Sequence, residues 1–257
     1  MQRPIVPGAT THRSLAASRS YWAAARAPRY SVLLALPLLL LYELLAMLLG
    51  PASGGVRNGA DALLRGVAIS IAGRWAPVVL GAALFGLGAW LVVRDARKHG
   101  WKWNRRWFGL MLGESALAAL LFGVVVGTAT SQLLGVLPLA IQGVVQQHGW
   151  ATWLMLSLGA GLYEELVFRV LLVGGIFALS TRVLGLSRRA SLAVAVLLSA
   201  LLFSLAHYVG PYGDPLQLGS FTYRFIAGVA FSGLYALRGF GITAWTHALY
   251  DVYVGFM

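Results

Sequence analysis

Three charged side chains lie close together in the middle of an otherwise apolar stretch. Residues 150–176 are long enough to cross a bilayer, yet Glu164, Glu165 and Arg169 interrupt them. A charged side chain at the bilayer centre costs roughly 2.5 to 3.5 kcal/mol on insertion scales. Because such groups persist only where they are paired, hydrated or used, we expect these three to be the start of an active site.

The spacing of these residues predicts one internal pair and one acid without a partner on its own helix. Glu165 and Arg169 are four residues apart, which places them on one helix face with the acid in the favourable N-terminal position. Glu164 is rotated by about 100° from Glu165 on an α-helix. Glu164 therefore has to find its partner elsewhere in the chain.

The candidate partners of Glu164 lie in later apolar segments. His207 is near the end of one segment, and His247 and Asp251 are four residues apart on the last one. Burying each polar group separately in hydrocarbon would be costly, so we expect the four side chains to converge. A carboxylate in a partly apolar site is a suitable general base.

The elements that position these residues are predicted to be membrane helices. The chain has 257 residues, of which 59% are hydrophobic and only 11% charged, and its mean hydropathy is +0.75. Such a composition indicates a polytopic all-α membrane bundle of about seven to eight transmembrane helices. The predicted spans are 30–50, 75–93, 109–135, 150–178, 191–209, 221–237 and 240–256, with an interfacial amphipathic helix at 54–74.

The distribution of basic residues predicts an N-terminus on the cytoplasmic side. With that orientation, fifteen Lys and Arg lie in inner segments and three in outer ones, as the positive-inside rule requires. We predict a basic cytoplasmic tail at 1–29, N-terminal membrane helices at 30–149 and a catalytic core at 150–257, in the inner cell membrane. The net charge of +12 does not predict nucleic-acid binding, because the basic residues lie between apolar segments. The absence of cysteine excludes disulfides and thiolate sites.

Other intramembrane polar and small residues have two interpretations. Glu43 and Glu114 each stand alone in a predicted span, and either interhelical hydrogen bonding or a place near the site explains them equally well. Gly123 and Gly127 form a GxxxG pair, which predicts the close approach of a neighbouring helix.

Three motifs in this order resemble the signatures of a known family. Glu164-Glu165-x-x-x-Arg169, Phe203-x-x-x-His207 and His247-x-x-x-Asp251 are similar to those of the CPBP family of intramembrane endopeptidases, the Rce1-like CAAX prenyl proteases and their bacterial relatives. The resemblance covers residues 155–255.

The resemblance implies a metal-independent glutamic protease. Glu164 with His207 would activate a water molecule, and His247 and Asp251 would stabilise the oxyanion or orient the site. Glu165, Arg169 and Phe203 would have structural or orienting roles. The family commonly has Asn where Asp251 stands, so orienting His247 or holding a metal also fits Asp251.

Several alternatives stay open on the sequence alone. Zinc or iron could be held by Glu164, His207, His247 and Asp251. An ion- or proton-coupled transporter uses the same kinds of groups. A non-catalytic immunity or scaffold membrane protein is a third alternative, because some members of the family that the chain resembles are associated with bacteriocin self-protection. The expected partners of a protease are a hydrophobic peptide substrate and the lipid bilayer, with no cofactor and no nucleic acid.

One geometric requirement accompanies all these readings. With straight helices, His207 would lie ~25 Å and His247 ~12 Å from the inner face, at 1.5 Å per residue. We therefore expect tilted or broken helices around the site.

Overall fold

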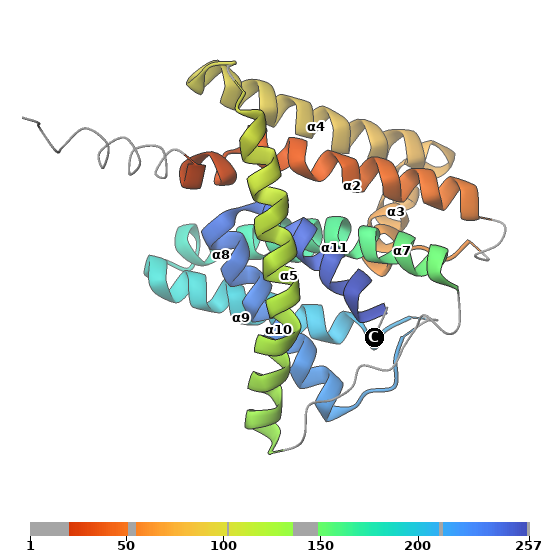
Figure 1. Cartoon of the computed structure of the whole chain (residues 1–257), viewed down its shortest axis with the longest axis vertical. Helices are drawn as coiled ribbons and strands as arrows, with labels where there is room; N and C mark the ends of the chain where they lie inside the picture. The colour runs from red at the N-terminus through yellow and green to blue at the C-terminus, as the bar shows by residue number, and fades with distance from the viewer. Residues whose placement is uncertain (1–20, 51–54, 102, 136–148, 211–212, 256–257) are drawn as a thin grey trace, which may run out of the picture.

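The chain folds entirely into helices wherever its structure is described. A computed structural model describes residues 21–50, 55–101, 103–135, 149–210 and 213–255, and none of these residues forms a strand (Figure 1). The all-α prediction is confirmed. The helices are α2 (Pro28–Leu49), α3 (Gly59–Ala72), η1 (Gly73–Trp75), α4 (Ala76–His99), α5 (Arg105–Leu134), α7 (Trp150–Gly159), η2 (Ala160–Val173), α8 (Gly174–Arg182), α9 (Arg188–Ala206), α10 (Leu218–Arg238) and α11 (Phe240–Gly255).

Each predicted span coincides with a helix of the structure. Four helical stretches among the described residues are long and apolar enough to cross a membrane, namely Pro28–Leu49, Gly59–His99, Arg105–Leu134 and Arg188–Ala206. Large apolar side chains on their outer faces are exposed, for example Leu48, Val124 and Leu133, at 67 to 70%. A surface of that kind suits lipid rather than water.

The N-terminal part of the chain is helical from residue 21 onward. Residues 1–20 of the predicted basic tail lie outside the described residues, whereas 21–26 form a short helix before α2. The Tyr21 hydroxyl donates to Glu114 on α5 over 2.7 Å. The end of the predicted tail is thus attached to the bundle.

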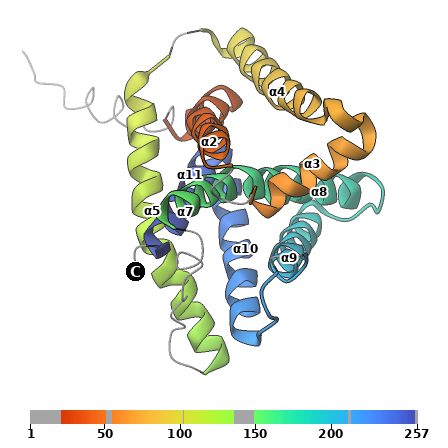
Figure 2. The same cartoon turned by 90° about the vertical axis from the view of Figure 1, so that its right-hand side faces the viewer.

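The helices cross at steep angles rather than running parallel. In Figure 1, α2 and α4 lie across the molecule while α5 runs perpendicular to them, and Figure 2 shows α10 at a steep angle to α7 and α8. The last helix, α11, packs against α2, α5, α7, η2 and α10. Because helices cross one another, residues at different positions along their helices can meet; the tilt of these helices relative to a bilayer stays a prediction.

The stretch that carries the acidic pair is a broken helix rather than one regular α-helix. It begins as α7, becomes π-helical over Ala160–Val173 and returns to α-helix in α8. A π-helix has i→i+5 hydrogen bonds and often occurs at functional sites. The 100° offset predicted for Glu164 and Glu165 assumed an α-helix, whereas both residues lie in the π-helical segment; its consequence holds, since Glu165 pairs with Arg169 and Glu164 has its partner elsewhere.

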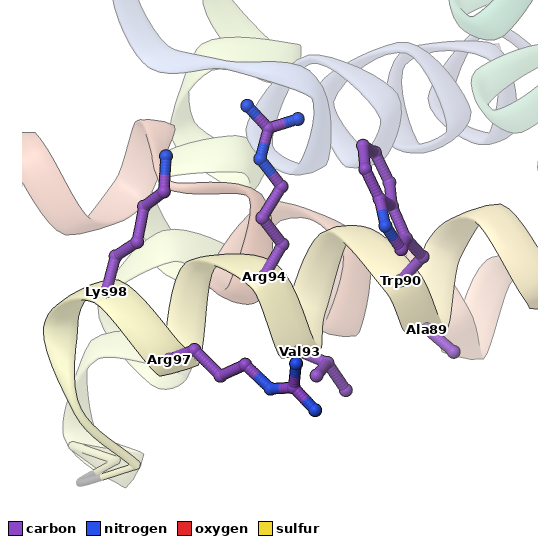
Figure 3. Close-up of a pocket in the computed structure, with 6 residues that line it drawn as sticks. All are labelled: Ala89, Trp90, Val93, Arg94, Arg97 and Lys98. Atoms are coloured by element: carbon purple, nitrogen blue, oxygen red, sulfur yellow. The ribbon is translucent and has the colours of Figure 1, made fainter.

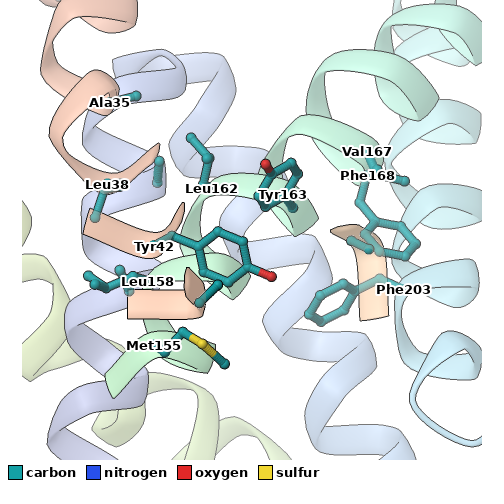
Figure 4. Close-up of a cluster of buried hydrophobic side chains, with 14 residues drawn as sticks. Ala35, Leu38, Tyr42, Met155, Leu158, Leu162, Tyr163, Val167, Phe168 and Phe203 are labelled. Carbon is teal, nitrogen blue, oxygen red and sulfur yellow. The ribbon is translucent and has the colours of Figure 1, made fainter. Parts of the chain in front are cut away.

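A cluster of buried apolar side chains surrounds this broken helix. Tyr42 on α2 meets Tyr163 on η2 edge to face, with ring centroids 5.3 Å apart, and Phe168 meets Phe203 on α9 in the same way at 5.2 Å (Figure 4). Aromatic pairs in this geometry contribute about 0.5–1.5 kcal/mol beyond their area burial. The cluster fixes α2, η2 and α9 relative to one another.

Glycines lie at two contacts of α11 with neighbouring helices. A Cβ at Gly161 would lie 2.3 Å from the Ala244 carbonyl oxygen, so η2 and α11 touch backbone to backbone. At the predicted GxxxG pair, Gly123 faces the Tyr250 ring, with 3.1 Å to the Cβ position, but Gly127 has no neighbour within 4 Å in the described residues. The close approach therefore occurs at Gly123 only.

Candidate active site

The three predicted motifs come together where η2, the end of α9 and α11 meet. Glu164 and Glu165 are on η2, His207 directly follows α9, and His247 is on α11. The distance from Glu164 Oε2 to His247 Nε2 is 3.9 Å. Glu164, His247 and Asp251 therefore lie in one group, as the cost of burying each alone led us to expect.

Glu165 holds His247. Its Oε1 lies 2.6 Å from His247 Nδ1, and its Oε2 lies 3.1 Å from Arg169 Nε. Glu165 and Arg169 are both completely buried. The predicted pair on one helix face is present, and the same carboxylate also directs Nε2 of His247 toward Glu164.

Arg169 is enclosed by aromatic rings rather than by hydrogen-bond acceptors. Its guanidinium carbon lies 4.4 Å from the centroid of the Phe203 ring and 5.2 Å from that of Phe231. Among the described residues, none of its side-chain nitrogens has a hydrogen-bond partner. The charge of Glu165 and the two ring faces are what compensate its burial.

Phe203 also separates the two histidines. Its ring is 5.0 Å from His207 and 6.2 Å from His247, edge to face in both cases. Phe231 stacks on the other side of His247 at 4.4 Å. Phe203 thus contacts both histidine rings, and its orienting role stays a prediction.

His207 presents one ring nitrogen to the site. Its Nδ1 lies 2.8 Å from the Phe203 carbonyl oxygen, and because a carbonyl can only accept, Nδ1 carries the proton and Nε2 is an acceptor in the neutral ring. Its charge and that of Glu164 are close enough to interact. The two residues predicted to activate water therefore lie within the range of a charge interaction, and their joint role stays a prediction.

Asn58 is a site residue that sequence reasoning missed. It precedes α3, and its Oδ1 accepts from the Ala60 backbone N–H at 2.9 Å as an N-cap. Since the cap fixes Oδ1, the amide nitrogen must be Nδ2, which donates to Glu164 Oε1 at 2.8 Å. The helix-capping role was readable from an Asn before a helix, whereas the contact across 106 residues had no signal in the sequence.

Asp251 lies at the edge of the group. Its Oδ2 is 3.7 Å from His247 Nε2, too far for a hydrogen bond, and its side chain is 25% exposed. Its backbone carbonyl accepts from Trp153 Nε1 at 3.0 Å. Glu165, rather than Asp251, makes the hydrogen bond that orients His247.

Glu43 belongs to a charged network beside the site. Arg65 pairs with both Glu43 and Asp61, at 2.6 and 2.7 Å, and Arg57 pairs with Asp61 at 2.9 Å. The Tyr163 hydroxyl donates to Glu43 over 2.9 Å. Burial alone would lower the pKa of Arg57, but the hydrogen bond and the charge of Asp61 raise it on balance.

This network joins α2, α3 and η2 next to Glu164. Asp61 is completely buried and pairs with Arg57 and Arg65, so these charged residues of the predicted interfacial helix face the protein, whereas Arg74 is exposed. Glu114 has a different place, since it pairs with Arg238 at the end of α10 and accepts from Tyr21. Of the two acids with open roles, Glu43 is therefore close to the site and Glu114 links helices elsewhere.

The side chains do not form a recognisable metal centre. Among the described residues, no three His, Cys, Asp or Glu side chains gather as metal ligands do. Glu165 engages Nδ1 of His247 and leaves Nε2 available. The zinc or iron alternative and the absence of a cofactor therefore both stay predictions.

Comparison with known proteins gives one match. Residues 146–253 match the family model described as type II CAAX prenyl endopeptidase Rce1-like. The match contains all three motifs and ends before the C-terminus, and the CPBP resemblance is confirmed. No curated protein and no solved structure matches the chain.

Proposed function

Residues 146–253 of this chain form an Rce1-like domain of the type II CAAX prenyl endopeptidases, and from that premise we propose that the protein is an intramembrane endopeptidase of the cell inner membrane. Its substrate is a membrane-associated hydrophobic polypeptide, and a prenylated C-terminal peptide is the first one to test. The reaction is hydrolysis of a peptide bond by a water molecule that Glu164 and His207 activate.

The observation that carries this proposal is the arrangement around Glu164. One carboxylate oxygen accepts from Asn58, and the other lies 3.9 Å from His247. A carboxylate fixed at one oxygen can take a proton at the other, which is what a general base requires. His207, with Nδ1 bound to a backbone carbonyl, offers Nε2 as a second acceptor for the same water.

The steps of the reaction follow from these positions. The water oxygen attacks the peptide carbonyl carbon, and its proton passes to the Glu164–His207 pair. The negative charge on the carbonyl oxygen is stabilised by a donor nearby, a role for which we propose His247 as an imidazolium, with Nδ1–H held by Glu165 and Nε2–H free to donate. When the C–N bond breaks, the Glu164–His207 pair returns a proton to the leaving amine.

The test uses purified protein in nanodiscs and a fluorogenic farnesylated peptide. We expect Glu164→Gln and His207→Ala each to lower kcat/KM by about 10²-fold or more, the range of a lost general base. The same peptide without the lipid group measures whether the prenyl chain is recognised.

Glu114→Gln is the matched control, because it makes the same change at another glutamate of the bundle. It should lower thermal stability through the lost partner of Arg238 but leave turnover per folded molecule close to wild type. Full turnover in a folded Glu164→Gln protein would exclude the proposed base.

A further inference from the structure

The C-terminal end of α4 carries a hollow in which apolar residues give way to cationic ones. The hollow has a volume of about 490 Å³ and is lined by Ala89, Trp90, Val93, Arg94, Arg97 and Lys98 (Figure 3). All of its lining residues belong to α4, so it is an open surface hollow along one helix. Neither the three motifs nor the proposed reaction uses it.

The lining residues form two parallel rows along the helix. Residues four apart share a helix face, so Trp90, Arg94 and Lys98 make one row, and Figure 3 shows these three side chains on the same side of α4. Ala89, Val93 and Arg97 make the other row. Both rows begin apolar and end cationic toward the helix C-terminus.

The cations of these rows lack acidic partners. The one acid of this turn, Asp95, is buried and pairs with Arg29 and His99. Within the part of the chain that the structure describes, Arg94, Arg97 and Lys98 form no ion pair, and Arg94 contacts only the Trp90 ring at 5.0 Å. The negative end of the helix dipole equals only about half a charge, which leaves most of this positive charge uncompensated.

The order of residues along α4, apolar first and cationic at the end, indicates which kind of ligand the rows bind. The preceding turns of α4 expose Val78, Phe85 and Leu87, at 50 to 63%, which suits acyl chains. A tryptophan followed by cations is typical of the membrane interface, and basic residues there attract anionic lipid. A molecule that satisfies both ends of each row has an apolar tail and an anionic head.

We infer that the hollow on α4 binds an anionic phospholipid, with its phosphate beside Arg94, Arg97 and Lys98 and the start of an acyl chain against Trp90. This site is separate from the proposed active site and does not depend on proteolysis. It retains one lipid class beside α4.

Binding of short-chain phosphatidylglycerol to the full-length protein in uncharged detergent tests the inference. The triple change Arg94→Gln, Arg97→Gln and Lys98→Gln should weaken affinity on the order of tenfold or more. The matched control, Arg182→Gln, Arg188→Gln and Arg189→Gln, removes the same charge from exposed positions around the α8–α9 connection and should change affinity less than about twofold.

Two further measurements distinguish the sources of the phosphate and the role of the tryptophan. Glycerol 3-phosphate should not compete with the lipid at equal concentration, and Trp90→Ala should weaken binding without altering charge. The inference is overturned by equal loss in both triple variants, by equal binding of phosphatidylcholine, or by full competition from glycerol 3-phosphate. If the triple variant has no melting transition, the single variant Lys98→Gln replaces it in the binding measurement. Wild-type affinity of Lys98→Gln for the lipid then overturns the inference.

Discussion

Replacing Asn58 by serine separates the two hydrogen bonds of this side chain. Asn58 is buried, caps α3 through Oδ1 and donates to Glu164 through Nδ2. Serine is an equally good N-cap, but its side chain is too short to reach Glu164. Asn58→Ser therefore removes the donor and keeps the cap, whereas Asn58→Ala removes both.

The two hydrogen bonds of Asn58 set the expected losses of activity and of stability. A hydrogen bond to a charged group contributes roughly 1.5–3 kcal/mol, and each 1.36 kcal/mol is tenfold in rate. If the whole bond serves to hold the base, kcat/KM of Asn58→Ser falls roughly 10- to 150-fold. Loss of an N-cap costs typically about 1 kcal/mol, so only Asn58→Ala should also lose stability to that extent.

The assay is cleavage of the farnesylated peptide, run beside thermal unfolding of the same preparations. Asn58→Asp is a third variant, which keeps the cap but places a second carboxylate against Glu164, and it should be less active than Asn58→Ser. Wild-type kcat/KM in a folded Asn58→Ser protein would refute the reasoning. So would activity losses in all three variants that simply follow their melting temperatures.

Three other predictions concern the packing and charges of the site. Gly161→Val should abolish folding or activity, because its Cβ would lie 2.3 Å from a carbonyl oxygen of α11. Gly174→Val is the control, since a Cβ at Gly174 meets no atom within 4 Å among the described residues. Thermal unfolding of both variants measures the difference. Arg169→Met should destabilise the protein by about 3–5 kcal/mol, because it leaves Glu165 buried without its cation. Denaturant unfolding measures this loss, and the double variant Arg169→Met with Glu165→Gln should recover part of it. Wild-type stability of the single variant would contradict the prediction. Asp251→Asn should retain most of the turnover and Asp251→Ala should lose it, because the family resemblance gives Asp251 a role beside His247 that an amide, which donates at any pH, can fill. Peptide-cleavage rates decide, and equal loss in both variants would show that the carboxylate itself is needed.

The convergence of the site could be predicted because burying charge in a membrane is costly. Glu164, His207 and His247 are far apart in sequence. The free-energy cost of burying each of them separately in hydrocarbon was what indicated that they meet. The pair of Glu165 and Arg169 followed from spacing in the same way. These predictions depended on residue type and approximate depth, which the sequence provides.

The finer geometry could not be predicted. Nothing in the residue spacing distinguished the π-helical segment Ala160–Val173 from an α-helix, so the relation between Glu164 and Glu165 was derived for α-helical geometry. Asn58 lies in a polar link with no motif, and only the folded chain brings it to Glu164. The second contact of Glu165, with His247, likewise depends on how closely η2 approaches α11 at Gly161.

The hydrogen bond from Asn58 to Glu164 means that the peptidase-like segment is incomplete by itself. A fragment starting near residue 146 would contain every signature residue and still lack the amide that fixes its acid. Chimeras can join this segment to the first helices of a relative. They should be active only where the relative's residue at the N-cap of α3 can also donate a hydrogen bond to Glu164.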